Sequence, residues 1–287
     1  MSTIERVGVV GAGLMGSGIA EVCARAGLDV LVSEVDAGAL EAGQQRIAHS
    51  LSRGVRAGKL SEDERGAAAG RIAYTTSLDD FSDRDLVVEA VAEVEPLKLE
   101  IFARLDKVVT RADAIFASNT SSIPIMKLAM ATSRPAQVIG VHFFNPAPVL
   151  KLVEIIPSLL SSDETQARVE ELATGTLGKT VVRSQDRAGF VVNALLIPYL
   201  LSAIRMFESG FASADDIDNG MVLGANHPMG PLRLTDLIGL DTTKAVAESM
   251  YEEFKEPLYS PPPLLLRMVD AGLLGKKSGR GFYDYTR

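Results

Sequence analysis

Cysteine, strongly basic segments and long hydrophobic runs are all scarce in this chain. Cys23 is the only cysteine among 287 residues, which excludes an internal disulfide and a metal cage of four cysteines. Its position inside a predicted helix indicates a buried structural thiol rather than a nucleophile. Aspartate and glutamate (37) outnumber lysine and arginine (29), and no dense basic stripe interrupts this acidity. We therefore expect no nucleic-acid partner.

Signals for secretion or membrane insertion are also missing. The opening segment, MSTIERVGVV, enters a strand almost at once and lacks the basic and apolar regions of a signal peptide. The longest apolar stretch, Ala188–Ile204, is interrupted by Asn193 and Pro198 and is too short and too polar to span a bilayer comfortably. We predict a cytoplasmic protein that has no membrane partner.

Composition and length favour an ordinary globular protein of about two domains. The chain is 47% hydrophobic and 23% charged, which is enough apolar mass for a sizeable core. Strand and helix patterns alternate up to residue 187, and helical periodicity dominates beyond it. We predict an α/β fold: a Rossmann-type doubly wound sheet in residues 1–187, mostly parallel with antiparallel strands at the end, and an all-helical domain in residues 188–287.

Hydrophobic periodicity gives the expected positions of the individual elements. Strands are predicted at Val7–Val10, Val30–Ser33, Leu86–Val91, Ala114–Ser118, Val138–Phe143 and Leu152–Ile156. Helices are predicted at Gly16–Ala26, Ala37–Arg56, Leu60–Ala69, Glu95–Val109, Phe190–Glu208, Ala214–Leu223, Leu234–Phe254 and Leu264–Ala271. Ser213 precedes one of these helices with an acid three residues after it, which is an N-cap signature.

The first predicted strand runs directly into a glycine-rich segment, GAGLMGSG. The spacing of Gly11, Gly13 and Gly16 lets a tight turn bring backbone N–H groups against a pyrophosphate at the start of a helix. Leu14 and Met15 lie within the same segment. We therefore predict that these five residues bind a dinucleotide cofactor.

An acidic residue, Glu34, ends the second predicted strand. A carboxylate at this place can accept hydrogen bonds from both ribose hydroxyls of an adenosine, and it repels a 2′-phosphate. No arginine follows in the next segment to attract such a phosphate. The pattern favours NAD over NADP, and the alternative is an acid that merely lies on the surface at a strand end.

Histidine is the residue type most suited to proton transfer near neutral pH, and the chain has three. His49 lies on a charged helix and is predicted to face solvent. His227 precedes a proline between two helices and is predicted to be structural. His142 ends an apolar strand, and ligands bind at the carboxyl ends of strands in such sheets. His142 is therefore the candidate general base.

A partner for this histidine follows from the turn after it. Two apolar runs flank the segment NPAP, and an antiparallel hairpin centred near Pro148 places His142 directly opposite Glu154. Opposed residues have Cβ atoms about 4.5–5.5 Å apart. A carboxylate there would fix the imidazole tautomer and stabilise the imidazolium. The alternative is a cross-strand pair of structural value only.

Two further polar groups remain open to either interpretation. The segment Ser118–Ser122, SNTSS, follows another apolar strand, where small polar residues form turns or donate hydrogen bonds to a ligand. Asn193 lies in an apolar helix, where its amide needs a hydrogen-bond partner. That partner is either another residue of the protein or the substrate.

Taken together, these segments resemble the short-chain L-3-hydroxyacyl-CoA dehydrogenases, especially their bacterial 3-hydroxybutyryl-CoA members. The matching strings extend over almost the whole chain: GAGLMGSGIA, VVEAVAE, FASNTSS, HFFNPAPVLKLVEII, GFVVNALLIPYL, HPMGPLRLTDLIGLDT and GKKSGRGFY. The resemblance implies that His142 is the general base and Glu154 its orienting carboxylate. It also implies that Ser121 and Asn193 bind the oxygen and thioester region of the substrate.

The same resemblance implies cofactor and CoA contacts. Positions that contact NAD in the family are matched by Glu93, Lys98, Asn119, Asn145 and Lys277. Ser50 matches a position that contacts CoA. Lys59 lies near a second CoA position, which Ala57 occupies if no gap is allowed.

The resemblance implies an NAD-dependent, reversible oxidation of a (3S)-3-hydroxyacyl-CoA. No metal ion is needed, because an imidazolium and hydroxyl donors polarise the carbonyl. We also predict a homodimer formed through the helical domain. The apolar helix Phe190–Leu201 agrees with such an association, because a small domain cannot hide it alone. Two alternatives remain. One is a dehydrogenase of a 3-hydroxy acid or sugar acid without CoA, and the other is a non-catalytic NAD-binding protein.

Overall fold

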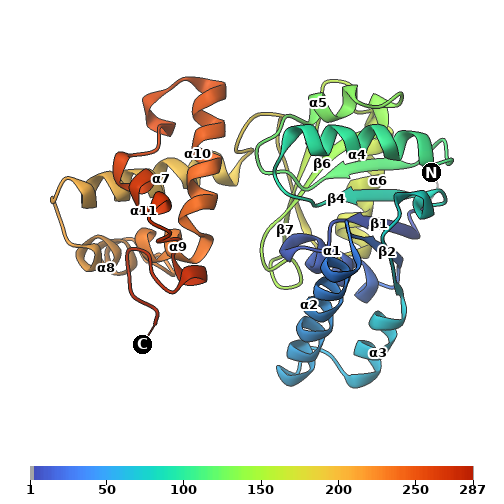
Figure 1. Ribbon diagram of the computed structural model, residues 1–287, viewed down its shortest axis with the longest axis horizontal. Coiled ribbons are helices and arrows are strands. Elements are labelled where there is room, and N and C mark those ends of the chain that lie inside the picture. Colours follow the sequence, from blue (N-terminus) through green and yellow to red (C-terminus); the bar gives the residue numbers. More distant parts are fainter. Residues whose placement is uncertain (1–2, 287) are drawn as a thin grey trace. The chain divides into compact units, whose positions relative to one another are not determined.

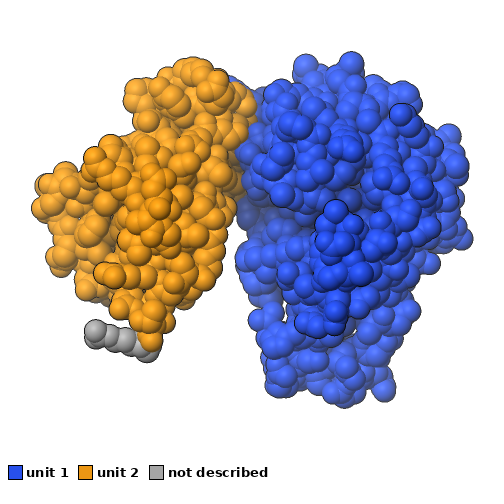
Figure 2. All heavy atoms as spheres, viewed as in Figure 1, with its two compact units in different colours: residues 1–187 blue, residues 188–287 orange. Residues whose placement is uncertain are grey.

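The computed structural model describes residues 3–286, which form two compact units divided after Arg187 (Figure 2). The first unit holds an eight-stranded sheet with helices around it, and the second is built from helices. The division falls where alternating strand and helix patterns give way to helical periodicity.

The sheet of the first unit has the spatial order β3-β2-β1-β4-β5-β6-β7-β8. Its strands are β1 (Arg6–Val10), β2 (Asp29–Ser33), β3 (Ile72–Thr75), β4 (Leu86–Glu89), β5 (Ile115–Ser118), β6 (Val138–Phe143), β7 (Leu152–Pro157) and β8 (Thr180–Arg183). Neighbours from β3 to β6 pair in parallel, β6 and β7 pair antiparallel, and β7 and β8 pair in parallel. This confirms the predicted doubly wound sheet with antiparallel strands at its end.

The strand order indicates where along the sheet a ligand would bind. The chain moves outward from β1 to β3 and then returns to the other side of β1 to form β4. The carboxyl ends of β1 and β4 therefore flank a topological switch point, where open α/β sheets bind their ligands.

Six helices accompany the sheet in the described part of the first unit: α1 (Leu14–Arg25), α2 (Ala37–Arg56), α3 (Glu62–Gly70), α4 (Glu95–Val108), α5 (Ile125–Met130) and α6 (Asp163–Glu171). Local capping explains where some of them begin. The Asp36 side chain accepts a hydrogen bond from the N–H of Ala39 at the start of α2, and Ser61 and Glu64 form a reciprocal capping box on α3. Helices α2 and α3 extend away from the sheet and pack against each other (Figure 1).

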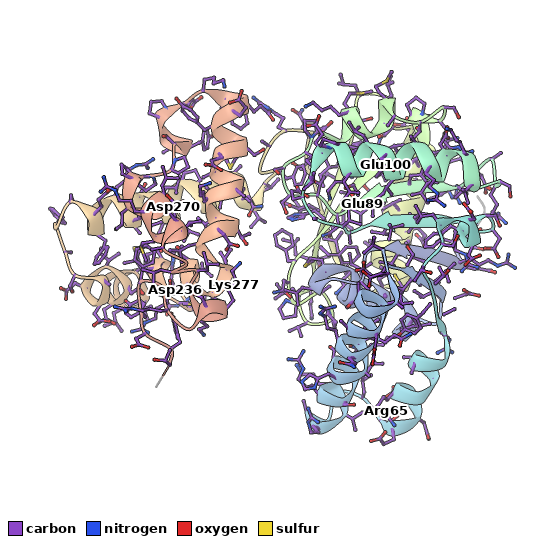
Figure 3. The ribbon with its side chains drawn as sticks, in the orientation of Figure 1. Arg65, Glu89, Glu100, Asp236, Asp270 and Lys277 are labelled. Atoms are coloured by element: carbon purple, nitrogen blue, oxygen red, sulfur yellow. The ribbon has the colours of Figure 1, made fainter. Side chains whose placement is uncertain are left out.

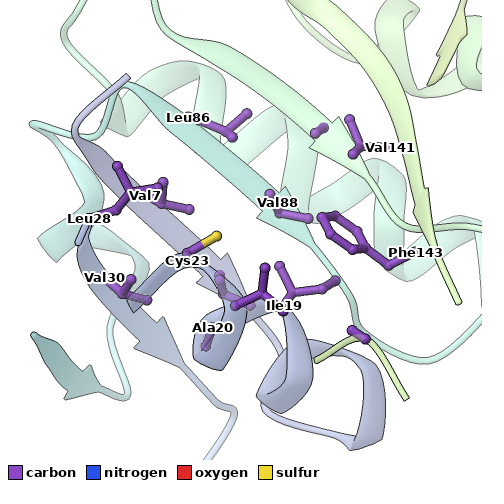
Figure 4. Close-up of a cluster of buried hydrophobic side chains, with 14 of the residues drawn as sticks. Val7, Ile19, Ala20, Cys23, Leu28, Val30, Leu86, Val88, Val141 and Phe143 are labelled. Carbon is purple, nitrogen blue, oxygen red and sulfur yellow. The ribbon is translucent and has the colours of Figure 1, made fainter. Parts of the chain in front are cut away.

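One face of the sheet packs against α1 to form the main hydrophobic core. Figure 4 shows Ile19 and Cys23 of α1 against Val7, Val88 and Phe143 of the strands. The Cys23 side chain is buried, and its burial raises the pKa of the thiol to about 12. A thiol in this environment stays protonated at neutral pH, as the prediction of a structural cysteine requires.

The structure adds elements that periodicity did not predict. Strands β3 and β8 are four residues long and partly exposed, so neither gives a clear apolar run. Helices α5 and α6 are short and were also missed. The prediction of one helix over Leu234–Phe254 was wrong. Gly239, with φ of 105°, breaks this segment into two helices, while apolar positions continue on both sides of it.

The second unit contains α7 (Val192–Glu208), α8 (Ala214–Gly224), α9 (Pro231–Ile238), α10 (Leu240–Phe254) and α11 (Pro263–Asp270). The predicted cap is confirmed, because Ser213 Oγ accepts a hydrogen bond from the N–H of Asp216 at 3.2 Å. Asp236 of α9 is buried and accepts hydrogen bonds from the N–H groups of Phe282 (2.9 Å) and Tyr283 (3.0 Å). One buried carboxylate thus holds the last segment of the chain against the helices.

Within residues 3–286, none of the helices combines the length and the apolar character that a bilayer crossing requires. The cytoplasmic location stays a prediction.

Candidate active site

The glycine turn between β1 and α1 has the geometry that dinucleotide binding needs. Gly11 has φ of 94°, and a Cβ atom added at Gly16 would lie only 1.8 Å from the carbonyl oxygen of Gly11. A Cβ atom at Gly13 would meet no other atom within 4 Å, and Gly13 is the N-cap of α1. The first and third glycines therefore close the turn, while the second leaves its backbone open to a phosphate at the helix N-terminus.

Leu14 and Met15 form the start of α1 directly after this turn. Leu14 is exposed and Met15 is partly buried. The helix begins two residues earlier than predicted, so that its first N–H groups come from the glycine segment itself.

Glu34 follows β2 and lies beside the glycine turn. One carboxylate oxygen accepts a hydrogen bond from the N–H of Ala12 at 2.6 Å, and the other accepts one from the N–H of Val35 at 3.1 Å. The carboxylate is thus held next to the phosphate-binding turn, where a ribose would lie. These residues fit a dinucleotide whose adenosine half lies over β1 and β2.

The opposed pair in the hairpin is confirmed by the strand register. β6 and β7 pair antiparallel with His142 directly opposite Glu154, and His142 Nδ1 lies 2.8 Å from Glu154 Oε2. Both side chains are buried. A carboxylate can only accept at this contact, so Nδ1 carries the proton and Nε2 presents a lone pair.

A serine hydroxyl lies on the other side of this imidazole. Ser121 Oγ is 3.2 Å from His142 Nε2. The loop that carries Ser121 follows β5, and Asn119 Oδ1 in this loop accepts a hydrogen bond from the N–H of Phe143 at 2.8 Å. This contact joins the carboxyl ends of β5 and β6, so the serine and the histidine are brought together by neighbouring strands.

The same loop is organised around the carboxylate of Glu93. One oxygen of Glu93 accepts hydrogen bonds from the N–H of Ser121 (3.0 Å), the N–H of Ser122 (3.2 Å) and the hydroxyl of Thr120. Its second oxygen pairs with Lys98 Nζ at 2.9 Å. Burial by itself would raise the pKa of Glu93, but the charge of Lys98 and these hydrogen bonds outweigh it and hold that pKa below its ordinary value. Glu93 is therefore a carboxylate at neutral pH.

Comparison with known proteins assigns this arrangement to a family. Residues 6–187 match the family model described as "3-hydroxyacyl-CoA dehydrogenase, NAD binding domain". Residues 189–285 match the one described as "3-hydroxyacyl-CoA dehydrogenase, C-terminal domain". This chain belongs to the 3-hydroxyacyl-CoA dehydrogenase family. The resemblance inferred from the sequence motifs is confirmed, and the chain is an enzyme that uses NAD.

Individual relatives agree with this assignment along their full length. A 3-hydroxybutyryl-CoA dehydrogenase of Mycobacterium tuberculosis is 64% identical over 282 residues, which cover 98% of this dehydrogenase and 99% of the relative. The crystal structure of M. tuberculosis FadB2 superposes with a TM-score of 0.98 at 63% identity, covering 99% and 100% of the two chains. The (S)-3-hydroxybutyryl-CoA dehydrogenase of Ralstonia eutropha gives a TM-score of 0.93 at 47% identity, covering 99% and 100%.

The two residues expected near CoA line different cavities of the dehydrogenase. Ser50 of α2 and Asn145 line a cavity of about 320 Å³, together with residues of α1. Lys59 lines another cavity of about 400 Å³, with Arg25 and Lys179. Ser50 and Asn145 therefore line one cavity, and Lys59 lines a different one.

Two of the predicted site residues belong to the second unit. Asn193 is half-buried in the first turn of α7. Lys277 Nζ pairs with Asp241 of α10 at 2.6 Å. The contact of Asn193 with substrate and that of Lys277 with NAD stay predictions.

The sequence interpretation missed one charged residue of this region, Glu89. Lys98 was expected to touch NAD, but its ammonium group is buried and lies 2.9 and 3.0 Å from the two carboxylate oxygens of Glu89. Ser118 Oγ also donates to Glu89, at 2.6 Å. The sequence did contain a signal for Glu89, namely a carboxylate at the end of an apolar strand. A charge that is buried there requires partners.

Proposed function

We propose that this dehydrogenase oxidises (3S)-3-hydroxybutyryl-CoA reversibly to acetoacetyl-CoA, with His142 as the general base. The observation that carries the proposal is the buried contact of 2.8 Å between His142 Nδ1 and Glu154 Oε2, which places Nε2 on the side of the ring that faces Ser121 Oγ, where a substrate hydroxyl would bind. The relatives at 64% and 47% identity are both named 3-hydroxybutyryl-CoA dehydrogenases, which supports the choice of substrate.

In the oxidation, His142 Nε2 removes the proton of the 3-hydroxyl group. Glu154 accepts the Nδ1–H hydrogen bond throughout and stabilises the positive charge that the imidazole acquires. The Ser121 hydroxyl, 3.2 Å from Nε2, can bind the same substrate oxygen. NAD, when bound, supplies the acceptor for the hydride from C3. In the reduction, the imidazolium returns its proton to the oxygen.

The remaining site residues enter the proposal as contacts. We propose that the glycine turn, Glu34, Glu93, Asn119 and Asn145 face NAD, and that the cavity containing Ser50 receives part of the CoA group. Lys59, Asn193 and Lys277 are proposed on the family resemblance alone. Lys98 is proposed to contact NAD on the family resemblance, and its buried ammonium group also pairs with Glu93 at 2.9 Å.

The test of the function is an assay of NADH formation with (3S)-3-hydroxyacyl-CoA esters from C4 to C16, run beside free 3-hydroxybutyrate and beside NADP. We expect the highest kcat/KM with the C4 ester and NAD. Faster oxidation of the free acid than of its CoA ester would instead support a dehydrogenase of acids without CoA. An absence of turnover with the C4 ester, when longer esters are oxidised, would contradict the choice of substrate.

Cofactor choice is predicted to depend on Glu34. Replacing Glu34 by glutamine removes charge-assisted hydrogen bonds to the ribose, worth about 1.5–3 kcal/mol, and removes the repulsion of a 2′-phosphate. The ratio of kcat/KM for NAD to that for NADP should therefore fall by about 10- to 100-fold. Steady-state kinetics with both cofactors measure this ratio. The same substitution at Glu41, which is exposed on α2, should leave it unchanged, and an equal ratio in wild type and Glu34→Gln would contradict the assignment.

We also propose that the second unit mediates homodimer formation. Phe211 is 79% exposed and lines an almost wholly apolar cavity with Met206, Ile217 and Met221. A monomer rarely leaves such a surface open to water, and a second copy of this chain would cover it. Light scattering during gel filtration should give a dimer mass for the wild type and a monomer mass for Phe211→Glu. The control, Leu159→Glu at an exposed position of the first unit, should remain dimeric. A wild-type monomer at micromolar concentration would overturn the proposal.

A further inference from the structure

A completely buried carboxylate, Glu89, stands at the carboxyl end of β4 (Figure 3). It accepts hydrogen bonds from the N–H of Val91 (2.7 Å) and the hydroxyl of Ser118 (2.6 Å), and it pairs with Lys98. A buried ion pair contributes little net stability compared with apolar residues of the same volume. The presence of a charge here therefore points to a role in arranging its neighbours.

Lys98 connects this buried carboxylate to a more exposed one. Its ammonium group lies 2.9 Å from Glu89 Oε1 and 2.9 Å from Glu93 Oε2. Glu89 is 0% exposed, whereas the side chain of Glu93 is 37% exposed. The two carboxylates share one cation, so the position of Lys98, and with it that of Glu93, depends on Glu89.

The exposed end of this cluster holds the backbone of Ser121. Glu93 accepts the N–H of Ser121 at 3.0 Å, and the hydroxyl of the same serine lies 3.2 Å from His142 Nε2. A second connection runs through Ser118, whose hydroxyl donates to Glu89 and accepts a hydrogen bond from the N–H of Thr120 at 3.2 Å. Two continuous routes of polar contacts thus lead from one buried carboxylate to the loop beside the imidazole.

We propose that Glu89 is a positioning residue that sets the place of the Ser121 hydroxyl relative to His142. It touches neither substrate nor cofactor and acts through Lys98 and Ser118. Without its charge, Lys98 is left with a single carboxylate and moves toward it, and the loop that carries Ser121 shifts with Glu93. Displacements of about 1 Å in an active site can cost about 100-fold in rate. The inference rests on the proposed function, because it assumes that Ser121 takes part in turnover.

The test is a double-mutant cycle between Glu89→Gln and Ser121→Ala, measured as kcat for oxidation of (3S)-3-hydroxybutyryl-CoA. We expect Glu89→Gln alone to lower kcat by about 10- to 100-fold. In the Ser121→Ala background, Glu89→Gln should lower kcat by less than about twofold. The effects of substitutions do not add when one residue acts through the other. A contribution to stability alone would give additive effects.

Asp85→Asn is the matched control for this cycle. Asp85 directly precedes β4, is also buried, and accepts hydrogen bonds from the N–H groups of Glu5 (2.9 Å) and Arg6 (2.8 Å) at the opposite end of the strand. It should lower the melting temperature without coupling to Ser121. If Glu89→Gln does not fold, Ser118→Ala replaces it in the cycle, since it removes one hydrogen bond to Glu89 without changing charge.

Two results would overturn the inference. One is additive effects of the two substitutions in the cycle. The other is a fall in kcat for Glu89→Gln while Ser121→Ala by itself leaves kcat unchanged. The failure of the proposed function is seen separately, because the wild-type enzyme would then not oxidise the CoA ester.

Discussion

Replacement of His142 by glutamine is expected to lower kcat by about 10²–10⁴-fold, because this is the usual contribution of a positioned general base. Glutamine has nearly the size of histidine and can still bond to Glu154, but it cannot take a proton at the position of Nε2. NAD affinity should change by less than about twofold, because the glycine turn and Glu34 adjoin β1 and β2, which β4 and β5 separate from β6 in the sheet.

Stopped-flow or steady-state formation of NADH measures the turnover of this variant, and isothermal titration calorimetry measures its NAD affinity. The control is His227→Gln in the second unit, where Nδ1 lies 3.1 Å from the hydroxyl of Tyr199 and kcat should stay at the wild-type level. Wild-type turnover in His142→Gln would remove the general base from the mechanism.

The second large effect is expected for Glu154→Gln, with a fall in kcat of about 10²–10⁴-fold. The carboxylate is buried, and its Oε2 lies 2.8 Å from His142 Nδ1. A neutral amide gives less stabilisation to the imidazolium, and its NH₂ group favours the tautomer that has a proton on Nε2. That tautomer cannot accept the proton of the substrate.

A double variant separates this orienting role from general damage to the fold. If the two residues act as one unit, His142→Gln with Glu154→Gln should be no slower than His142→Gln alone. Thermal unfolding of each variant, followed by circular dichroism, supplies the control for stability. Multiplicative losses in the double variant would show that Glu154 acts independently of the histidine.

The pair of His142 and Glu154 was predictable because its partners are close in the sequence. A short turn centred near Pro148 sets the register of the antiparallel hairpin, and the register decides which side chains face each other. The glycine segment and Glu34 were predictable for a similar reason, since a strand, a turn and a helix follow one another along the chain.

The network around Glu89 could not be derived in this way. Glu89 ends β4, Lys98 belongs to α4 and Ser118 ends β5, so their contacts arise when separate elements pack together. The sequence pattern showed a charge at the end of an apolar strand but no partner for it. The break at Gly239 was missed because hydrophobic periodicity records which residues face a core and is insensitive to the φ angle of one glycine.

The sequence by itself determined the α/β order of the first unit, the helical character of the second, the glycine turn after the first strand and the histidine with its carboxylate. These features depend on local patterning and short turns, in which each residue is constrained by neighbours in the chain. Only the tertiary structure decided that Ser121 lies beside the imidazole and that Glu93, Lys98 and a buried Glu89 hold its loop. Such contacts depend on how strand ends and helices meet across the sheet, and one-dimensional spacing does not contain that information.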